Sequence, residues 1–159
     1  MSPRLRSSIA LAFFIGLCLA VGALGSFFTE MSRESWYTRI AKPAWTPPDR
    51  VFGIVWTLLY VLMGIAAWLV WRTTGLARGI TPLSLFAVQL ALNLAWSAIF
   101  FGLRAPGAAF IQVLVLWSLV LATVIVFWRV RPLAGALLLP YLLWTTFAAA
   151  LNLAIWRMN

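Results

Sequence analysis

Residues 42–60, KPAWTPPDRVFGIVWTLLY, join a proline-rich polar segment to the start of a long apolar run. Each of the three prolines fixes its own φ angle, lacks an N–H donor and disfavours helix at the residue before it. We therefore expect residues 41–49 to be ordered, extended and non-helical. Beyond them, Trp56 and Tyr60 are four positions apart, which places both on one face of the helix that follows.

The composition outside this stretch is that of a membrane protein. Of 159 residues, 64% are hydrophobic and 9% are charged, whereas soluble domains carry about 25% charged residues. The mean hydropathy is +1.00. The net charge of +9 forms no patch, because the charged residues lie between long apolar runs. We therefore expect an integral membrane protein and no binding to nucleic acid.

The charged residues leave five uncharged runs: 7–29, 51–71, 79–103, 105–128 and 132–156. Each is long enough to cross a hydrocarbon core about 30 Å thick as a helix, which satisfies its own backbone hydrogen bonds in lipid. The predicted fold is all-α, with residues 1–159 forming a single bundle of five transmembrane helices. The approximate helices are 8–28, 51–71, 82–103, 106–128 and 133–156, and the loop 29–50 caps a pocket.

The first run also has features of a secretory signal peptide. Arg4 and Arg6 precede it, and residues 23–26 loosely resemble a cleavage site. Its apolar stretch is about 20 residues, however, which is longer than the roughly 7–15 of a signal peptide, so we favour a retained helix. Five crossings place loop 29–50 and the C-terminus on the side opposite the N-terminus. Six basic residues fall on each side, so the positive-inside rule does not choose an orientation.

The residues needed for common catalytic chemistry are missing from the spans. The chain has one cysteine, Cys18, and no histidine, so we expect no disulfide framework and no metal site. All three acidic residues lie in the loop 29–50. Acid–base or nucleophilic catalysis and proton relay through the membrane are therefore not predicted, and no cofactor is required.

Ten tryptophans are several times the usual number. Four adjoin helix ends and fit the aromatic belt at the lipid headgroups: Trp68, Trp71, Trp128 and Trp156. Four others do not adjoin the ends in this way: Trp56, Trp96, Trp117 and Trp144. A buried indole N–H needs a hydrogen-bond partner, and lipid offers none.

Most of these unusual residues fall in the half of the bilayer beneath loop 29–50, counting about 1.5 Å per residue along each helix. The predicted pocket there combines residues from four helices: Gly25, Ser26, Trp56, Tyr60, Asn93, Trp96, Trp144, Ala148, Leu151 and Asn152. Deep polar side chains usually face a bundle interior or a cavity. The alternative is that Asn93 and Asn152 only join helices by hydrogen bonds.

The helix at 82–103 has two different faces. At about 100° per residue, Gln89, Asn93 and Trp96 point in similar directions, and we expect this face to be turned inward. A stripe of small residues lies roughly opposite: Ala87, Ala91 and Ala95. Because small residues allow helix backbones to approach closely, we expect this stripe to form a homodimer interface.

Several short motifs occur in a fixed order along the chain. They are Trp36-Tyr37, Lys42-Pro43, Trp45, Pro47-Pro48, Trp56, the segment 89–96 (QLALNLAW), 100–102 (FFG), 140–144 (PYLLW), Ala148, Leu151-Asn152 and Trp156-Arg157. Within five apolar runs, this set resembles the translocator protein / tryptophan-rich sensory protein family. The resemblance covers nearly the whole chain.

The resemblance implies a five-helix membrane receptor or sensor that binds porphyrins such as protoporphyrin IX, and in animals cholesterol and benzodiazepine-site drugs. It implies a loop-covered pocket lined by Pro47, Trp56, Tyr60, Asn93, Trp96, Trp144, Ala148 and Leu151. With these we include Trp36 and Tyr37 of the same motif, and Gly25, Ser26 and Asn152. In some bacterial relatives, the tryptophans matching Trp56 and Trp144 are tied to light-dependent porphyrin breakdown, so we assign both a photochemical catalytic role.

Two positions depart from the animal members. Leu153 stands where the cholesterol motif has a tyrosine, and Ala108 stands where an animal tryptophan lies. The short tails are similar to those of bacterial members, so we expect a bacterial membrane. A transporter of porphyrin or lipid and a structural dimer are the alternatives. The pocket aromatics favour a receptor over a purely structural dimer, and nothing in the sequence separates a receptor from a transporter.

Overall fold

The computed structural model describes residues 2–159, and over this range the chain is helical without a β-strand. Four helices are long and apolar enough to cross a membrane. The predicted all-α fold is therefore confirmed, and the chain is a multi-pass integral membrane protein. In chain order, the elements are α1 (Pro3–Ser32), the π-helical turn η1 (Arg33–Tyr37), α2 (Asp49–Ser97), the π-helical turn η2 (Ala98–Gly102), α3 (Pro106–Val130) and α4 (Pro132–Met158).

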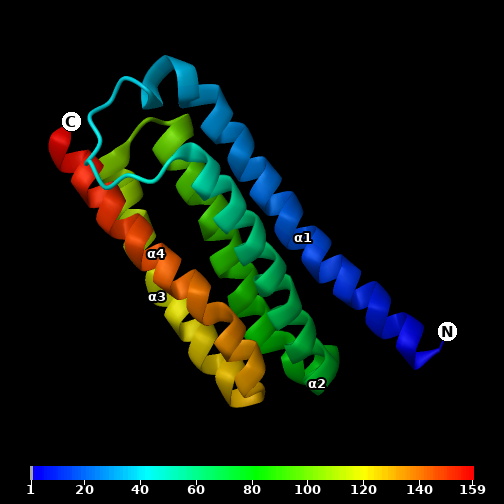
Figure 1. Ribbon diagram of the computed structural model, residues 1–159. Helices are drawn as coiled ribbons and strands as arrows, with labels where there is room; N and C mark the ends of the chain where they lie inside the picture. Colours follow the sequence, from blue (N-terminus) through cyan, green and yellow to red (C-terminus); the bar gives the residue numbers. More distant parts are fainter. Residues whose placement is uncertain (1) are drawn as a thin grey trace.

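Helix α2 contains the predicted helix 51–71 and residues 82–97 of the predicted helix 82–103, so the predicted count of five helices is not confirmed. Its 49 residues would span about 74 Å as one straight rod. The helix is broken at Gly75, where φ is 67° and ψ is −176°, a conformation that glycine adopts far more readily than other residues. Figure 1 shows that α2 turns back on itself at the end of the bundle where it is labelled. We refer to residues 49–74 and 76–97 as its first and second halves.

Residues 38–48, which we call the capping loop, connect η1 to α2. As predicted, residues 41–48 are non-helical. They are not extended throughout, because the Thr46 N–H donates to the Pro43 carbonyl (3.0 Å) and closes a turn. The predicted loop 29–50 was too long at both ends. The chain remains helical through Tyr37, and Asp49 already begins α2 after the extended Pro48.

The capping loop and the C-terminus lie at one end of the bundle, and the N-terminus lies at the other (Figure 1). Asn159 joins the first two directly. Its side-chain oxygen accepts from the Ala41 N–H (2.9 Å), and its Nδ2 donates to the Ala41 carbonyl (3.0 Å). Helices α3 and α4 lie side by side, and the single extended residue Arg131 connects them. These contacts hold the loop across the end of the bundle where the polar residues gather.

Glycines let α1 approach α2 closely. A methyl group built on Gly64 would lie 2.6 Å from the Cα of Ile15, and one built on Gly22 would lie 2.5 Å from the ring of Tyr60. By contrast, a methyl group on Gly16 would meet nothing within 4 Å. Because lipid tails are as apolar as the side chains, helix association in membranes relies on such close packing.

We predict that Gly64→Ala destabilises the fold by roughly 1–3 kcal/mol, the usual range for overpacking a tight site. The added methyl group meets backbone atoms of α1, which cannot rotate away as a side chain can. The measurement is unfolding in detergent, with Gly16→Ala as the matched control. Gly16→Ala should be neutral or stabilising, because alanine favours helix over glycine. Equal stability of the two variants would contradict the close approach of α1 and α2.

Candidate functional site

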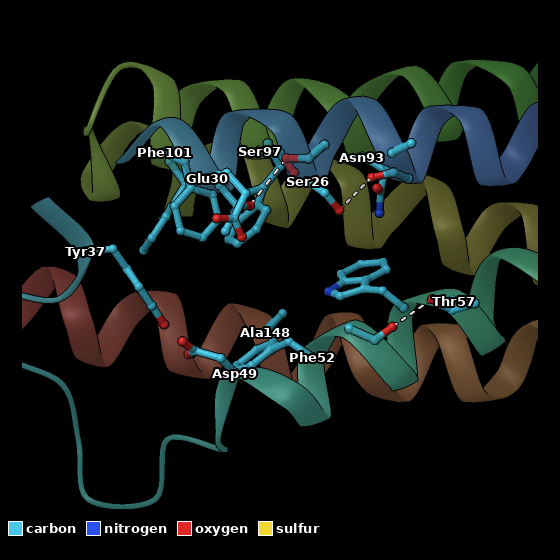
Figure 2. Close-up of a pocket in the computed structure, with 18 of the residues that line it drawn as sticks. Ser26, Glu30, Tyr37, Asp49, Phe52, Thr57, Asn93, Ser97, Phe101 and Ala148 are labelled. Carbon is cyan, nitrogen blue, oxygen red and sulfur yellow. Dashed lines mark hydrogen bonds between the residues drawn. The ribbon is translucent and has the colours of Figure 1, made fainter. Parts of the chain in front are cut away.

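A cavity of about 430 Å³ lies in the half of the bundle next to the capping loop. Its walls come from α1, η1, both halves of α2, η2 and α4. Its volume falls within the roughly 300–1,000 Å³ typical of small-molecule pockets. Figure 2 shows Ser26 and Glu30 of α1 facing Asp49 and Phe52 of the first half of α2 across this space. The cavity is therefore built between helices that are far apart in the sequence.

The structure brings most of the predicted ligand-binding residues together at this cavity. Those that line it are Gly25, Ser26, Tyr37, Trp56, Tyr60, Asn93, Trp96, Trp144, Ala148, Leu151 and Asn152. Trp36 and Pro47 are not among the lining residues. Trp36 packs edge-on against Phe100 instead (5.7 Å between ring centroids), and Pro47 is half-buried within the capping loop.

Aromatic rings form much of the cavity wall. Trp56 stacks on Tyr60 with ring centroids 5.6 Å apart and planes inclined by 29°. Trp144 is held by edge contacts with Phe52, at 5.7 Å, and by Phe147, at 5.2 Å. Such pairs stabilise by about 0.5–1.5 kcal/mol beyond the area they bury. The ring positions on this wall are therefore well defined by packing before any ligand enters.

The two deep asparagines both line the cavity and both join helices. Tyr60 Oη donates to Asn93 Oδ1 (2.6 Å), and Asn93 Nδ2 donates to Tyr141 Oη of α4 (3.0 Å). Asn152 accepts from Trp96 Nε1 (3.0 Å) and donates to the Pro106 carbonyl at the start of α3 (2.8 Å). Each asparagine therefore joins helices and also lines the cavity, so joining helices is not the only feature that the structure gives them.

The interior tryptophans differ in what their indole N–H groups contact. Trp96 donates to Asn152, and Trp117 donates to Thr146 Oγ1 (2.7 Å) on the outer side of α3 and α4. Trp68, assigned to the belt, also donates to the Ser7 carbonyl of α1 (3.0 Å). The N–H of Trp144 is buried and has no acceptor among residues 2–159. Other atoms of Trp144 line the cavity, but its N–H is not exposed to it.

Three charged residues at the cavity rim were not predicted from the sequence. Arg33 Nη1 lies 3.1 Å from Glu30 Oε1, and Arg33 Nη2 lies 3.1 Å from Asp49 Oδ2. All three line the cavity, and the Arg33–Asp49 pair joins the first residue of η1 to the first residue of α2. Exposed ion pairs contribute only about 0–1 kcal/mol, so this contact can open at little cost. The sequence did carry one indication of this cluster, because all three acidic residues of the chain lie in the predicted loop 29–50.

Other lining residues could have been found from their helical spacing. Phe52 precedes Trp56 by four positions, so the two share a face. Phe100 and Phe101 belong to a motif that had been noted only for its resemblance, yet both are buried and line the cavity. Ser32 of α1 donates to the Phe101 carbonyl, which fixes η2 against α1.

The alanine stripe proposed as a dimer interface lies outside the cavity. Ala87 and Ala91 are exposed and Ala95 is half-buried, whereas Gln89 and Asn93 on the opposite face are 1% and 4% exposed. The predicted separation of an inner polar face from an outer small-residue face is therefore confirmed. The dimer itself stays a prediction.

Comparison with known proteins assigns the chain to a family. Residues 14–157 match the model of the TspO/MBR family. The chain belongs to this family. The match extends from the middle of α1 to the end of α4, so it includes every element that forms the cavity.

Curated relatives agree with the TspO/MBR assignment over nearly their full lengths. The chain is 44% identical to the tryptophan-rich protein TspO of Chlorobaculum tepidum, covering 97% of this chain and 98% of that one. It is 42% identical to the translocator protein of Homo sapiens, with 86% and 82% covered. It is 37% identical to the tryptophan-rich sensory protein of Cereibacter sphaeroides, with 93% and 92% covered.

We predict that Asn152→Ala destabilises this TspO/MBR protein by roughly 1–3 kcal/mol for each buried group left unpaired. The change removes the acceptor of the Trp96 N–H and the donor to the Pro106 carbonyl. Unfolding in detergent tests the prediction, with Ser118→Ala as the control. The Ser118 hydroxyl bonds only to its own helix, at Leu114, so its loss should change stability little. If both variants unfold alike, Asn152 does not join α2, α3 and α4 as described.

Proposed function

We propose that this TspO/MBR protein is a membrane receptor or sensor that binds porphyrins of the protoporphyrin IX type, and related flat apolar ligands, in the cavity beneath the capping loop. The observation that carries the proposal is the aromatic wall of the cavity, with Trp56, Trp96 and Trp144 among its lining residues. The name of the Cereibacter sphaeroides relative, a sensory protein, supports the same class of function. Porphyrin is the ligand in this proposal, and no cofactor is required.

The lining residues suit a flat, mostly apolar molecule with a polar edge. Rings from three helical segments, Trp56, Trp96 and Trp144, offer faces and edges for stacking. The charged side chains at the cavity, Glu30, Arg33 and Asp49, belong to its rim. A porphyrin would place its apolar ring against the indoles and its carboxylates toward this rim, where the opened Arg33 pair supplies a partner.

The photochemical role of Trp56 and Trp144 belongs to this proposal. An excited porphyrin would take one electron from an indole, which gives an indole radical cation and a porphyrin radical anion. Dioxygen dissolved in the membrane would then add to the porphyrin radical anion, and return of one electron from this adduct to the indole radical cation would restore the tryptophan and leave an oxygenated porphyrin. Both indoles line the cavity, so each would lie within contact of a bound ring.

Two further features are proposed with the receptor. The first is that α2 crosses the bilayer twice, since it turns back at Gly75 and each half carries one of the predicted apolar runs. This gives five crossings in all.

The second feature is a homodimer through the exposed stripe of Ala87 and Ala91 with Ala95, because small exposed residues on a membrane helix allow a second helix to approach closely.

The first prediction concerns binding. Titration of the purified protein with protoporphyrin IX should quench tryptophan fluorescence with saturation. Trp144→Phe should weaken binding by up to about tenfold, because it removes part of the aromatic surface that lines the cavity. Trp128→Phe is the matched control, because Trp128 lies at the far end of α3 and is 45% exposed. Unsaturable quenching, or an equal effect of the two variants, would reject the cavity as the porphyrin site.

The second prediction concerns light. Phenylalanine keeps much of the stacking surface but is a far poorer electron donor than tryptophan. Trp56→Phe and Trp144→Phe should therefore lose most light-dependent porphyrin loss when compared with the unaltered protein at matched occupancy. Porphyrin absorbance under illumination is the readout. The same photobleaching rate in all three proteins and in protein-free detergent would reject the photochemical role and leave binding untouched.

The third prediction concerns the five crossings. Single cysteines introduced at Ala44 and Met158 should react with a membrane-impermeant reagent from the same side, and a cysteine at Leu76 should react only from the other. Cys18 is buried and should stay unlabelled in the folded protein. Labelling of Ala44 and Leu76 positions from one side would mean that α2 does not cross and return.

A further inference from the structure

Arginines gather at the end of the bundle that lies away from the capping loop, which we call the basic end. They come from three places that are far apart in the sequence: the start of α1, the turn of α2 around Gly75, and the junction of α3 with α4. Figure 1 shows all three places at the end of the bundle where the N-terminus lies. The arginines are Arg4, Arg6, Arg72, Arg78, Arg129 and Arg131.

No acidic residue balances the charge of the basic end. The three acids of the chain are Glu30, Glu34 and Asp49, and they belong to the end of α1, to η1 and to the start of α2, next to the capping loop. Two of them pair with Arg33 there, each at 3.1 Å. The positive charge of the basic end therefore needs an anion from outside the chain.

Two of these arginines stack on neighbouring tryptophans of the first half of α2. The guanidinium carbon of Arg72 lies 5.2 Å from the ring centroid of Trp68, and that of Arg6 lies 5.7 Å from the ring centroid of Trp71. A cation within about 6 Å of an indole face is attracted by the ring. Trp68 and Trp71 are three positions apart and share one side of the helix. One arginine from α1 and one from α2 are thus brought to the same place.

The packing of α1 against α2 fixes this place. Trp68 Nε1 donates to the carbonyl of Ser7 (3.0 Å), the residue that follows Arg6. One turn before Trp68, a methyl group built on Gly64 would lie 2.6 Å from the Cα of Ile15, so the two helices are in close contact. The two indole rings therefore hold the arginines in position before a partner binds, which lowers the entropy lost on binding.

Both stacked guanidinium groups keep their N–H donors unused. Arg6 and Arg72 are exposed, and neither side chain makes a hydrogen bond or an ion pair within the described residues 2–159. The arginine side chains that do bond to protein there are those of Arg33 and Arg104. A guanidinium presents its donors in a planar fork that matches two oxygens of a phosphate. Stacking covers the face of the fork and leaves its edge free for such oxygens.

The surroundings of the pair are those of a lipid. Tryptophans at the ends of membrane helices lie at the level of the headgroups, where the phosphates of the lipids are. Ile9 and Phe13 follow Arg6 at three and seven positions, so they continue its side of α1 toward the middle of the helix. They are 52% and 62% exposed. A headgroup at Arg6 would therefore have an open apolar surface beneath it for its acyl chains.

We propose that Arg6 and Arg72, on their tryptophan rings, form a binding site for the phosphate group of an anionic phospholipid. An anionic lipid is preferred to a zwitterionic one, because a zwitterionic headgroup carries its own positive charge and leaves the basic end unbalanced. The site lies at the opposite end of the bundle from the cavity under the capping loop. The inference therefore does not depend on the proposed function of that cavity.

Two lipids with the same acyl chains test the preference. Phosphatidylglycerol and phosphatidylcholine are added in equal amounts to the purified full-length protein in detergent, and bound lipid is counted by native mass spectrometry. The unaltered protein should bind phosphatidylglycerol about tenfold more tightly, as expected for two basic groups acting on one anionic headgroup. Phosphatidylglycerol should also raise resistance to unfolding more than phosphatidylcholine does. Equal binding of the two lipids would overturn the proposal.

Variants assign the preference to the stacked pair. Arg6→Gln combined with Arg72→Gln should bring the ratio of the two affinities close to one. Arg78→Gln combined with Arg129→Gln is the matched control, because it removes the same charge from the same end. The described residues place neither of these control arginines over an aromatic ring. The control should keep most of the preference, and an equal loss in both double variants would overturn the site.

A further variant tests the stacking without changing the charge. Trp71→Leu removes the ring under Arg6 and keeps both arginines, so it should weaken phosphatidylglycerol binding by about threefold. Unchanged affinity in this variant would contradict a site built on the indoles.

Glycerol phosphate separates a lipid from a free phosphate compound. At the same concentration as phosphatidylglycerol it should not displace the lipid, because it lacks acyl chains. Displacement by glycerol phosphate would overturn the assignment to a lipid.

Discussion

Asn93 makes the hydrogen bonds on which the arrangement of this bundle depends. In lipid, an unpaired polar group has no water with which to form a hydrogen bond, so a deep asparagine must bond to partners within the protein. Asn93 finds one on the first half of α2, at Tyr60, and one on α4, at Tyr141. These bonds fix the two halves of α2 and α4 relative to one another, both along the helix axes and in rotation about them. Asn152 does the same for α2, α3 and α4 nearer the loop.

The cavity follows from where these constraints lie. The polar links and the bulky aromatic residues are concentrated in the half of the bundle near the capping loop, so the helices there are spaced by rings and cannot close on one another. In the same bundle, glycines draw α1 against α2, which leaves the cavity between α1, α2 and α4. The Arg33 pairs and the Asn159–Ala41 contact then hold its rim and cover in place. The bonds of Asn93 and Asn152 therefore both support the fold and fix residues that line the site.

Sequence reasoning predicted the all-α fold, and 11 of the 13 predicted ligand-binding residues line the cavity, because much of both depends on local rules. Apolar length gives the spans, and helical spacing places Trp56 with Tyr60 and Asn93 with Gln89. Neither apolar length nor helical spacing predicts contacts between segments that are far apart in the sequence. Nothing in the spacing showed that Trp36 would pack on Phe100 or that Arg33 would reach Asp49. The break between the two halves of α2 is shorter than predicted, because helix persists on both sides of Gly75, where charged residues had indicated a loop.

The central claim is that ligand occupies the space between α1, α2 and α4, and filling that space tests it most directly. Ala148 lines the cavity, whereas Ala150 on the same helix is exposed and does not. Protoporphyrin IX titrations should show that Ala148→Phe abolishes saturable binding while the protein still unfolds cooperatively, and that Ala150→Phe leaves the affinity unchanged. An Ala148→Phe protein that is folded and binds protoporphyrin IX with unchanged affinity would contradict the account.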